Sequence, residues 1–138
     1  MALPNGGGGY QLGDGNLNEP IIDALPDPIS VTTAATLTPA QVLNGLILAN
    51  SGITAASVTY TLPTVADLEA VLTNSDKVGT AFTFRVVNLG TSSATAIIAA
   101  GTGWTITGSL TMTIPVTTGA MMIARKSAAG AWTLYRVA

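Results

Sequence analysis

The sequence predicts an all-β protein: a small body of β-sandwich, jelly-roll-like or β-tulip type, with one or two short helices and an extended N-terminal arm. Three observations predict it. From residue 29 onward, short β-type runs are punctuated by Gly, Asn and Pro, as in all-β domains. Two helix-start signals interrupt these runs, and residues 1–28 show no sustained hydrophobic period. We therefore divide the chain into an arm, residues 1–28, and a body, residues 29–138.

The arm differs from the body in charge and in turn-forming residues. It holds four acidic residues and no basic one, whereas the body holds three acidic and five basic residues, so the net charges are −4 and +2. A tetraglycine at 6–9 and four prolines indicate an extended segment with a flexible hinge. Its backbone entropy exceeds what its apolar side chains return on burial, so the arm cannot order itself.

The arm nevertheless carries more large apolar side chains than a solvated linker needs. We expect these side chains to be buried on a partner. The candidate contact residues are Leu3, Tyr10, Leu12, Leu17, Ile21, Ile22 and Leu25.

The body contains about nine strand-like runs. In one of them Val58, Tyr60 and Leu62 alternate with polar residues and share a face, and Phe82, Phe84 and Val86 share a face in another. The predicted strands are residues 29–34, 46–49, 58–62, 82–87, 95–99, 104–107, 109–114, 120–126 and 132–137.

A first helix is predicted after Thr38. Thr38 and Gln41 have the spacing of a capping box, and Pro39 occupies the first helical position, where its missing N–H is not needed. Gly45 is expected to end this helix after about two turns.

A second helix is predicted from Thr64 to about Thr73, where Asn74 and Ser75 end it. Asp67 lies in its first turn, near the positive end of the helix dipole. We expect this helix to cover one end of the body, and the side chains expected to be buried are Val65, Leu68, Val71 and Leu72.

The composition excludes much site chemistry. The chain has no His and no Cys, which removes Ser-His-Asp and Cys-His arrangements, the usual zinc sites and disulfides. Asp67 and Glu69 are two residues apart on a predicted helix, so they point in different directions and do not form a glycosidase pair. Residues 13–16 resemble the start of a calcium loop but lack its later ligands. We expect no enzyme activity, no metal and no cofactor.

Nucleic acid and membrane partners are not expected either. The five cations are dispersed and the chain is acidic overall, which gives no phosphate-seeking surface. No run approaches the roughly 20 apolar residues of a spanning helix, and the N-terminal residues do not have the pattern of a signal peptide. We expect a protein made in the cytoplasm that functions in solution or in an assembly.

The aromatic residues have two interpretations each. Phe82 and Phe84 are either core residues or stacking platforms for bases, and the core interpretation is favoured by Val86 on the same face. Trp104 and Trp132 are either packed at the end of the body or at a subunit contact, or they are sugar-stacking residues of a carbohydrate-binding module.

Four stretches and the preceding arm resemble the head decoration (cement) proteins of tailed bacteriophages. The resemblance covers residues 29–138 and is a pattern of Thr, Ala and Gly turns without a catalytic signature, so no functional residue transfers position by position. The stretches are 31–45 (VTTAATLTPAQVLNG), 61–64 (TLPT), 78–88 (VGTAFTFRVVN) and 99–104 (AAGTGW).

The resemblance implies a small β protein, usually a homotrimer, on the outer surface of the virion. There it braces neighbouring major capsid protein subunits against internal DNA pressure. The leading hypothesis is therefore a capsid cement protein whose partners are the major capsid protein and possible neighbouring cement proteins. Its arm is expected to anchor it to capsid subunits or to a neighbouring cement protein. The alternative is a carbohydrate- or receptor-binding β module of a phage head or tail fibre.

Overall fold

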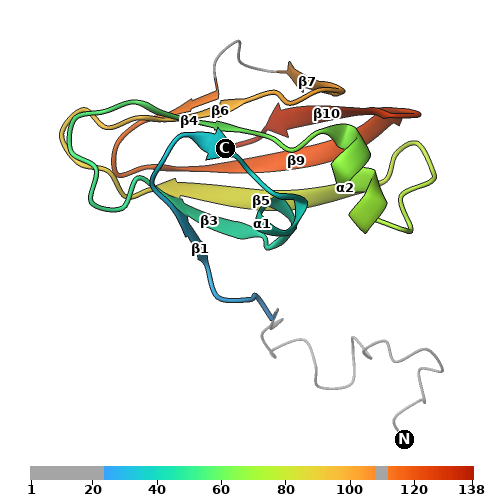
Figure 1. The fold of residues 1–138 in the computed structure, drawn as a ribbon, viewed down its shortest axis with the longest axis horizontal. Helices are drawn as coiled ribbons and strands as arrows, with labels where there is room; N and C mark the ends of the chain where they lie inside the picture. The colour runs from blue at the N-terminus through green and yellow to red at the C-terminus, as the bar shows by residue number, and fades with distance from the viewer. Residues whose placement is uncertain (1–23, 108–111) are drawn as a thin grey trace, which may run out of the picture.

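The computed structural model describes residues 24–107 and 112–138, which form ten strands and two short helices (Figure 1). The predicted β-rich class with short helices is confirmed, whereas the choice among sandwich, jelly roll and tulip stays a prediction. Residues 109–111 of one predicted strand lie outside the described residues. The elements are β1 (Ile29–Val31), β2 (Ala35–Thr36), α1 (Pro39–Leu43), β3 (Leu46–Ala49), β4 (Val58–Thr61), α2 (Val65–Val71), β5 (Ala81–Asn88), β6 (Ala96–Ala99), β7 (Trp104–Thr107), β8 (Met112–Ile114), β9 (Gly119–Ala128) and β10 (Ala131–Arg136).

The strands form two mixed sheets, a six-stranded sheet in the order β1-β3-β5-β9-β10-β7 and a four-stranded sheet in the order β2-β4-β6-β8. From β1 to β6, successive strands belong alternately to the two sheets. As a result β1, β3 and β5 are parallel, and so are β2, β4 and β6. Parallel neighbours need a crossover connection, and here a strand of the other sheet supplies it. Strand β9 is the antiparallel neighbour of both β5 and β10, and β7 completes the larger sheet as the parallel neighbour of β10.

The core lies between the two sheets. Strands β4, β6 and β8 contribute Tyr60, Ile98 and Met112, while β5 and β9 contribute Phe84 and Met122, and all belong to one buried cluster. The predicted alternation of β4 is confirmed, since Val58, Tyr60 and Leu62 are buried. Because side chains alternate between the two sides of a strand, each sheet also has a face directed away from the core.

The first helix, α1, has the predicted capping box. Thr38 Oγ1 accepts a hydrogen bond from the Gln41 amide at 3.2 Å, and Gln41 Oε1 accepts one from the Thr38 amide at 2.8 Å. Val42 is its fully buried residue, packed in the common core. Gly45 follows the helix with φ of 92°, a backbone conformation that glycine adopts without strain.

The second helix, α2, begins as predicted at Thr64, whose hydroxyl accepts from the Asp67 amide at 3.1 Å. It buries Val65 and Leu68, but Val71 is 56% exposed, so the prediction that Val71 is buried was wrong. Val65, Leu68 and Leu72 lie within about 60° of one another around the helix axis, and Val71 lies outside that sector. Close packing against β7 requires Gly103, because a Cβ there would lie 2.8 Å from Val65 Cβ.

Candidate assembly interface

The predicted contact residues of the arm lie outside the described residues, with the exception of Leu25. Leu25 is 57% exposed, and its Cδ2 lies beside Gly45, immediately before β3. Nearby, Asn44 Nδ2 donates a hydrogen bond of 3.0 Å to the carbonyl oxygen of Asp27. The arm therefore reaches the body along the edge formed by β1 and the start of β3.

The six-stranded sheet presents a largely apolar face on the side away from the core, which we call the outer face. Its side chains alternate along each strand with those of the core cluster, and its apolar members are only partly exposed. In the pairing register, Leu46, Arg85 and Met121 form one row across β3, β5 and β9. On the four central strands β3, β5, β9 and β10, which define the outer face, it comprises Leu46, Leu48, Thr83, Arg85, Val87, Met121, Ile123, Arg125, Thr133 and Tyr135.

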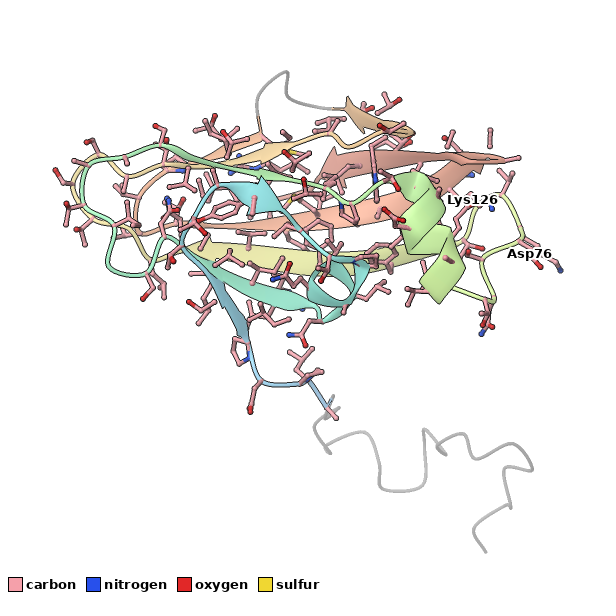
Figure 2. The ribbon with its side chains drawn as sticks, in the orientation of Figure 1. Asp76 and Lys126 are labelled. Carbon is pink, nitrogen blue, oxygen red and sulfur yellow. The ribbon has the colours of Figure 1, made fainter. Side chains whose placement is uncertain are left out.

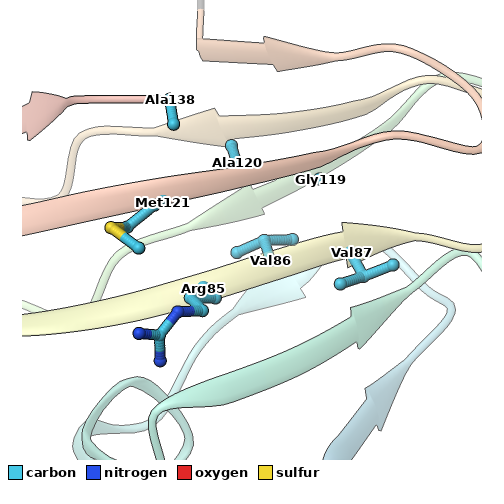
Figure 3. Close-up of a pocket in the computed structure, with 7 residues that line it drawn as sticks. All are labelled: Arg85, Val86, Val87, Gly119, Ala120, Met121 and Ala138. Atoms are coloured by element: carbon cyan, nitrogen blue, oxygen red, sulfur yellow. The ribbon is translucent and has the colours of Figure 1, made fainter.

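A groove of about 240 Å³ crosses this sheet between β5 and β9, with the C-terminal Ala138 at its border. Figure 3 shows Arg85 and Met121 on these adjacent strands, with Val87 further along β5. The absence of a side chain on Gly119, which pairs with Val87, leaves space there. The groove has mostly apolar walls and one cation, Arg85, at its margin.

The charge of the outer face is positive. Its two charged residues are Arg85 and Arg125, both exposed. The acidic residues of the body, Asp67, Glu69 and Asp76, lie instead on α2 and in the loop after it. The outer face therefore suits a partner that is both apolar and acidic.

The four-stranded sheet presents a different outer surface. Thr59 and Thr61 of β4 and Thr113 of β8 point away from the core, next to Ile97 and Ala99 of β6. This surface carries hydroxyl groups and no charged side chain among the described residues. Hydroxyl groups remain well solvated in water, so this surface needs covering less than the apolar outer face does.

An ion pair ties α2 to β9 at one end of the body, where Figure 2 shows Lys126 beside α2. Lys126 Nζ lies 2.8 Å from Glu69 Oε1 and donates to the carbonyl oxygen of Ser75 at 2.8 Å. Trp132 Nε1 donates to the same Glu69 oxygen at 3.0 Å. The hydrogen bonds from Lys126 and Trp132 hold the pKa of Glu69 below its ordinary value.

The opposite end of the body is held by neutral side chains. Asn88 Nδ2 lies 2.8, 2.9 and 3.1 Å from the carbonyl oxygens of Ala94, Ile114 and Pro115, and Asn88 Oδ1 accepts from the Gly90 amide. These contacts join β5 to the loop before β6 and to the end of β8. Asn88 is fully buried, so these bonds replace water for four backbone groups.

Tyr60 and Asn50 form a second neutral contact in the same half of the body. The Tyr60 hydroxyl lies 2.7 Å from Asn50 Oδ1 and 3.0 Å from the carbonyl oxygen of Val31. Burial raises the pKa of Tyr60, an effect partly offset by its hydrogen bond with Asn50. Tyr60 thereby connects the four-stranded sheet to the edge strand β1 of the larger sheet.

Both tryptophans lie in the body rather than on its surface. Trp132 is fully buried and Trp104 is 7% exposed, and Trp104 Nε1 donates to the Pro63 carbonyl at 2.8 Å. Their ring centroids are 6.0 Å apart, and Phe82 lies 5.7 Å from Trp132. The interpretation of Trp104 and Trp132 as sugar-stacking residues is therefore wrong. Phe84 is also fully buried, so it offers no platform to a base.

The described residues contain little that suggests chemistry at a site. No group of three or more acidic residues in residues 24–107 and 112–138 is arranged to hold a metal ion. Asp67 Oδ2 accepts a hydrogen bond from the Thr64 hydroxyl at the start of α2, and Glu69 is committed to Lys126 and Trp132. Neither helix in these ranges has the length and hydropathy of a membrane-spanning segment.

The outer face was not identified from the sequence, although a signal for it was present. The stretch GAMMIAR at the start of β9 has apolar residues on both faces of the strand, and LILA of β3 does too. A sheet with one solvated face normally alternates apolar and polar residues. Apolar residues on both faces indicate that both faces are meant to be covered.

Comparison of the chain with protein-family models, with curated proteins and with solved structures finds no match.

Proposed function

We propose that this chain is a capsid decoration (cement) protein of a tailed bacteriophage, with a small β-sandwich body and an arm that anchors it. The support comes from the resemblance of residues 29–138 to that family and from the surface of the body. Its place would be the outer surface of the virion, after synthesis in the host cytoplasm, and its main partner the major capsid protein.

The observation that carries the proposal is the outer face of the six-stranded sheet. Leu46, Leu48, Val87, Met121 and Ile123 are only partly buried there, in adjacent strands. A contiguous apolar surface of this kind is stabilised by contact with another protein. The chain also has few charges, 9% of residues against about 25% in a typical soluble domain, as expected for a surface that is buried between many copies.

The arm adds the second element of a cement protein. A homotrimer would carry three arms, so several weak contacts would act together through a high effective concentration. Bracing then requires no catalytic residue and no bound ion, only extended contact between subunits. The proposal accordingly assigns stabilisation of the expanded head to the combination of arm and outer face.

The test is binding to expanded heads of the encoding phage that have been prepared without this protein. We expect the full-length chain to be trimeric by light scattering, to co-sediment with the heads and to raise the temperature at which they release DNA. Absence of co-sedimentation, or binding with no gain in head stability, would contradict the proposal.

A charge-matched pair of variants links the effect to the outer face. Arg85→Glu changes an exposed residue of that face, and Lys77→Glu makes the same change of charge at an exposed loop residue. We expect head stabilisation to fall with Arg85→Glu and to be retained with Lys77→Glu. Equal losses would indicate a general effect of charge rather than a role of the outer face.

A further inference from the structure

We propose that the outer face of the six-stranded sheet binds the N-terminal segment, residues 1–23, of a second copy of this chain. The inference deepens the proposed function and rests on it for its biological meaning, because it names the partner of the arm. Its test uses the protein in solution without capsids, so the two proposals fail separately.

The chemistry of the outer face is specific enough to select a partner. Across β3, β5 and β9, the row Leu46, Arg85 and Met121 places a cation between two apolar side chains. The second cation, Arg125, lies on β9 four residues beyond Met121, and the acidic residues of the body are elsewhere. A fitting partner has apolar side chains interspersed with carboxylates and lacks cations.

Residues 1–23 have this composition. They contain Asp14, Glu19 and Asp23 and no basic side chain, so their charge is opposite to that of the outer face. Complementary charges of this kind steer association and disfavour wrong partners. The same segment contributes large apolar side chains that match the apolar rows, namely Leu3, Tyr10, Leu12, Leu17, Ile21 and Ile22.

The length of the segment is sufficient to cross the sheet. Six strands at about 4.8 Å spacing are about 24 Å wide from the first to the last strand axis. Twenty-three extended residues reach about 75 Å. The segment can therefore leave its own body, span the distance to a neighbour and still cover the outer face of that neighbour.

The junction with the body favours the neighbour over the same chain. Pro26 and Pro28 fix their own φ angles and restrict Leu25 and Asp27 to extended conformations. Residues 24–28 are exposed and run along the edge of the body near Asn44, as Figure 1 shows below β1. A stiff, extended junction at a sheet edge opposes the tight reversal needed to fold back onto the adjacent face.

The chain has no cysteine, so introduced cysteines report the contact directly. One preparation carries Leu12→Cys or Leu17→Cys and an affinity tag, and the other carries Met121→Cys without the tag. The two are mixed and mildly oxidised, and disulfide-linked mixed dimers are quantified on a non-reducing gel. Thr59→Cys on the four-stranded sheet replaces Met121→Cys as the matched control.

We expect at least fivefold more mixed dimer with Met121→Cys than with Thr59→Cys, and a loss of that excess when Arg85→Glu is added to the Met121→Cys chain. Lys77→Glu in place of Arg85→Glu should retain the excess.

Three outcomes would overturn the proposal. Equal yields at Met121 and Thr59 would exclude selective binding. In a further variant that carries Leu12→Cys and Met121→Cys in the same chain, a disulfide formed only within that chain would place the arm on its own body. Efficient dimers of Met121→Cys alone would assign the outer face to a second sheet instead of an arm.

Discussion

The two ends of the body are closed by different chemistry. At the α2 end, the charged groups of Lys126 and Glu69 meet beside Trp132. At the opposite end the side chains are uncharged. Asn88 donates to backbone carbonyl oxygens, and the Tyr60 hydroxyl donates to Asn50 Oδ1. At both ends, side chains form hydrogen bonds with buried backbone groups. Only at the α2 end does neutralising one side chain leave an opposite charge without its partner. The difference predicts separate responses to mutation and to pH.

The largest expected effect is that of Asn88→Asp, which introduces a charge at the neutral end. The new carboxylate would face three carbonyl oxygens without a hydrogen to donate, so we expect a loss of about 4 kcal/mol in the free energy of unfolding at neutral pH. Urea unfolding measures it. Asn74→Asp, in an exposed position, is the control and should change stability by less than about 0.5 kcal/mol.

The Asn88→Asp variant should also recover stability in acid. The folded state raises the pKa of this carboxyl, so protonation favours the folded form and the defect grows as pH rises. A defect of the same size at pH 4 and pH 7 would contradict the account of Asn88 as a donor to carbonyl oxygens.

A smaller loss is expected when the charged end is broken. Lys126→Ala leaves the Ser75 carbonyl without its donor and Glu69 without its cation. Because the Glu69 side chain is 26% exposed, we expect the free energy of unfolding to fall by about 2–3 kcal/mol, at or below the low end for buried pairs. Lys77→Ala at an exposed site is the control. The double variant Glu69→Gln, Lys126→Met should be more stable than Lys126→Ala, since no charge then remains buried. A double variant that is less stable would show that the ion pair itself is required.

The smallest effects are those of pH on the unmodified protein, and they should separate the two ends. The lowered pKa of Glu69 means that its contribution is present above pH 4.5, its ordinary value, and is lost as the pH falls through the lower folded-state value. Stability measured from pH 6 down to pH 2 should therefore fall less steeply in Glu69→Gln than in the unmodified chain. Parallel curves would show that Glu69 does not contribute.

At alkaline pH the neutral end should respond instead. The raised pKa of Tyr60 means that its contribution is present below pH 10.0, its ordinary value, and is lost as the pH rises through the folded-state value. Tyr60→Phe should be less stable at pH 7 but should lose less between pH 9 and pH 11. A steeper alkaline loss in Tyr60→Phe would be inconsistent with a buried neutral hydroxyl.

Local signals predicted most of the elements. The capping box of Thr38 and Gln41 and the cap at Thr64 each depend on residues three positions apart, so they can be predicted from the sequence alone. The run 46–49 and the run 104–107 coincide with β3 and β7. The error at Val71 arose because the apolar pattern does not say which sector of a short helix faces the core.

The interface was less predictable. The predicted contact residues of the arm, apart from Leu25, lie outside the described part of the chain, so their role stays a prediction. The outer face depends on the register of β3, β5 and β9, whose rows join residues as distant as Leu46 and Met121. The sequence allowed two interpretations of Trp104 and Trp132, because the sequence of a strand does not show which residues of other strands pack against a tryptophan ring.

The sequence by itself determined the β-rich class, the two helix starts, the scarcity of charge and the acidic character of the arm, because these follow from composition and from neighbours a few residues apart. Only the tertiary structure decided that strands alternate between two mixed sheets, that Lys126 is buried against Glu69, and that two arginines share an apolar face. Those features join residues far apart in the chain, and their energies exist only once the strands have paired.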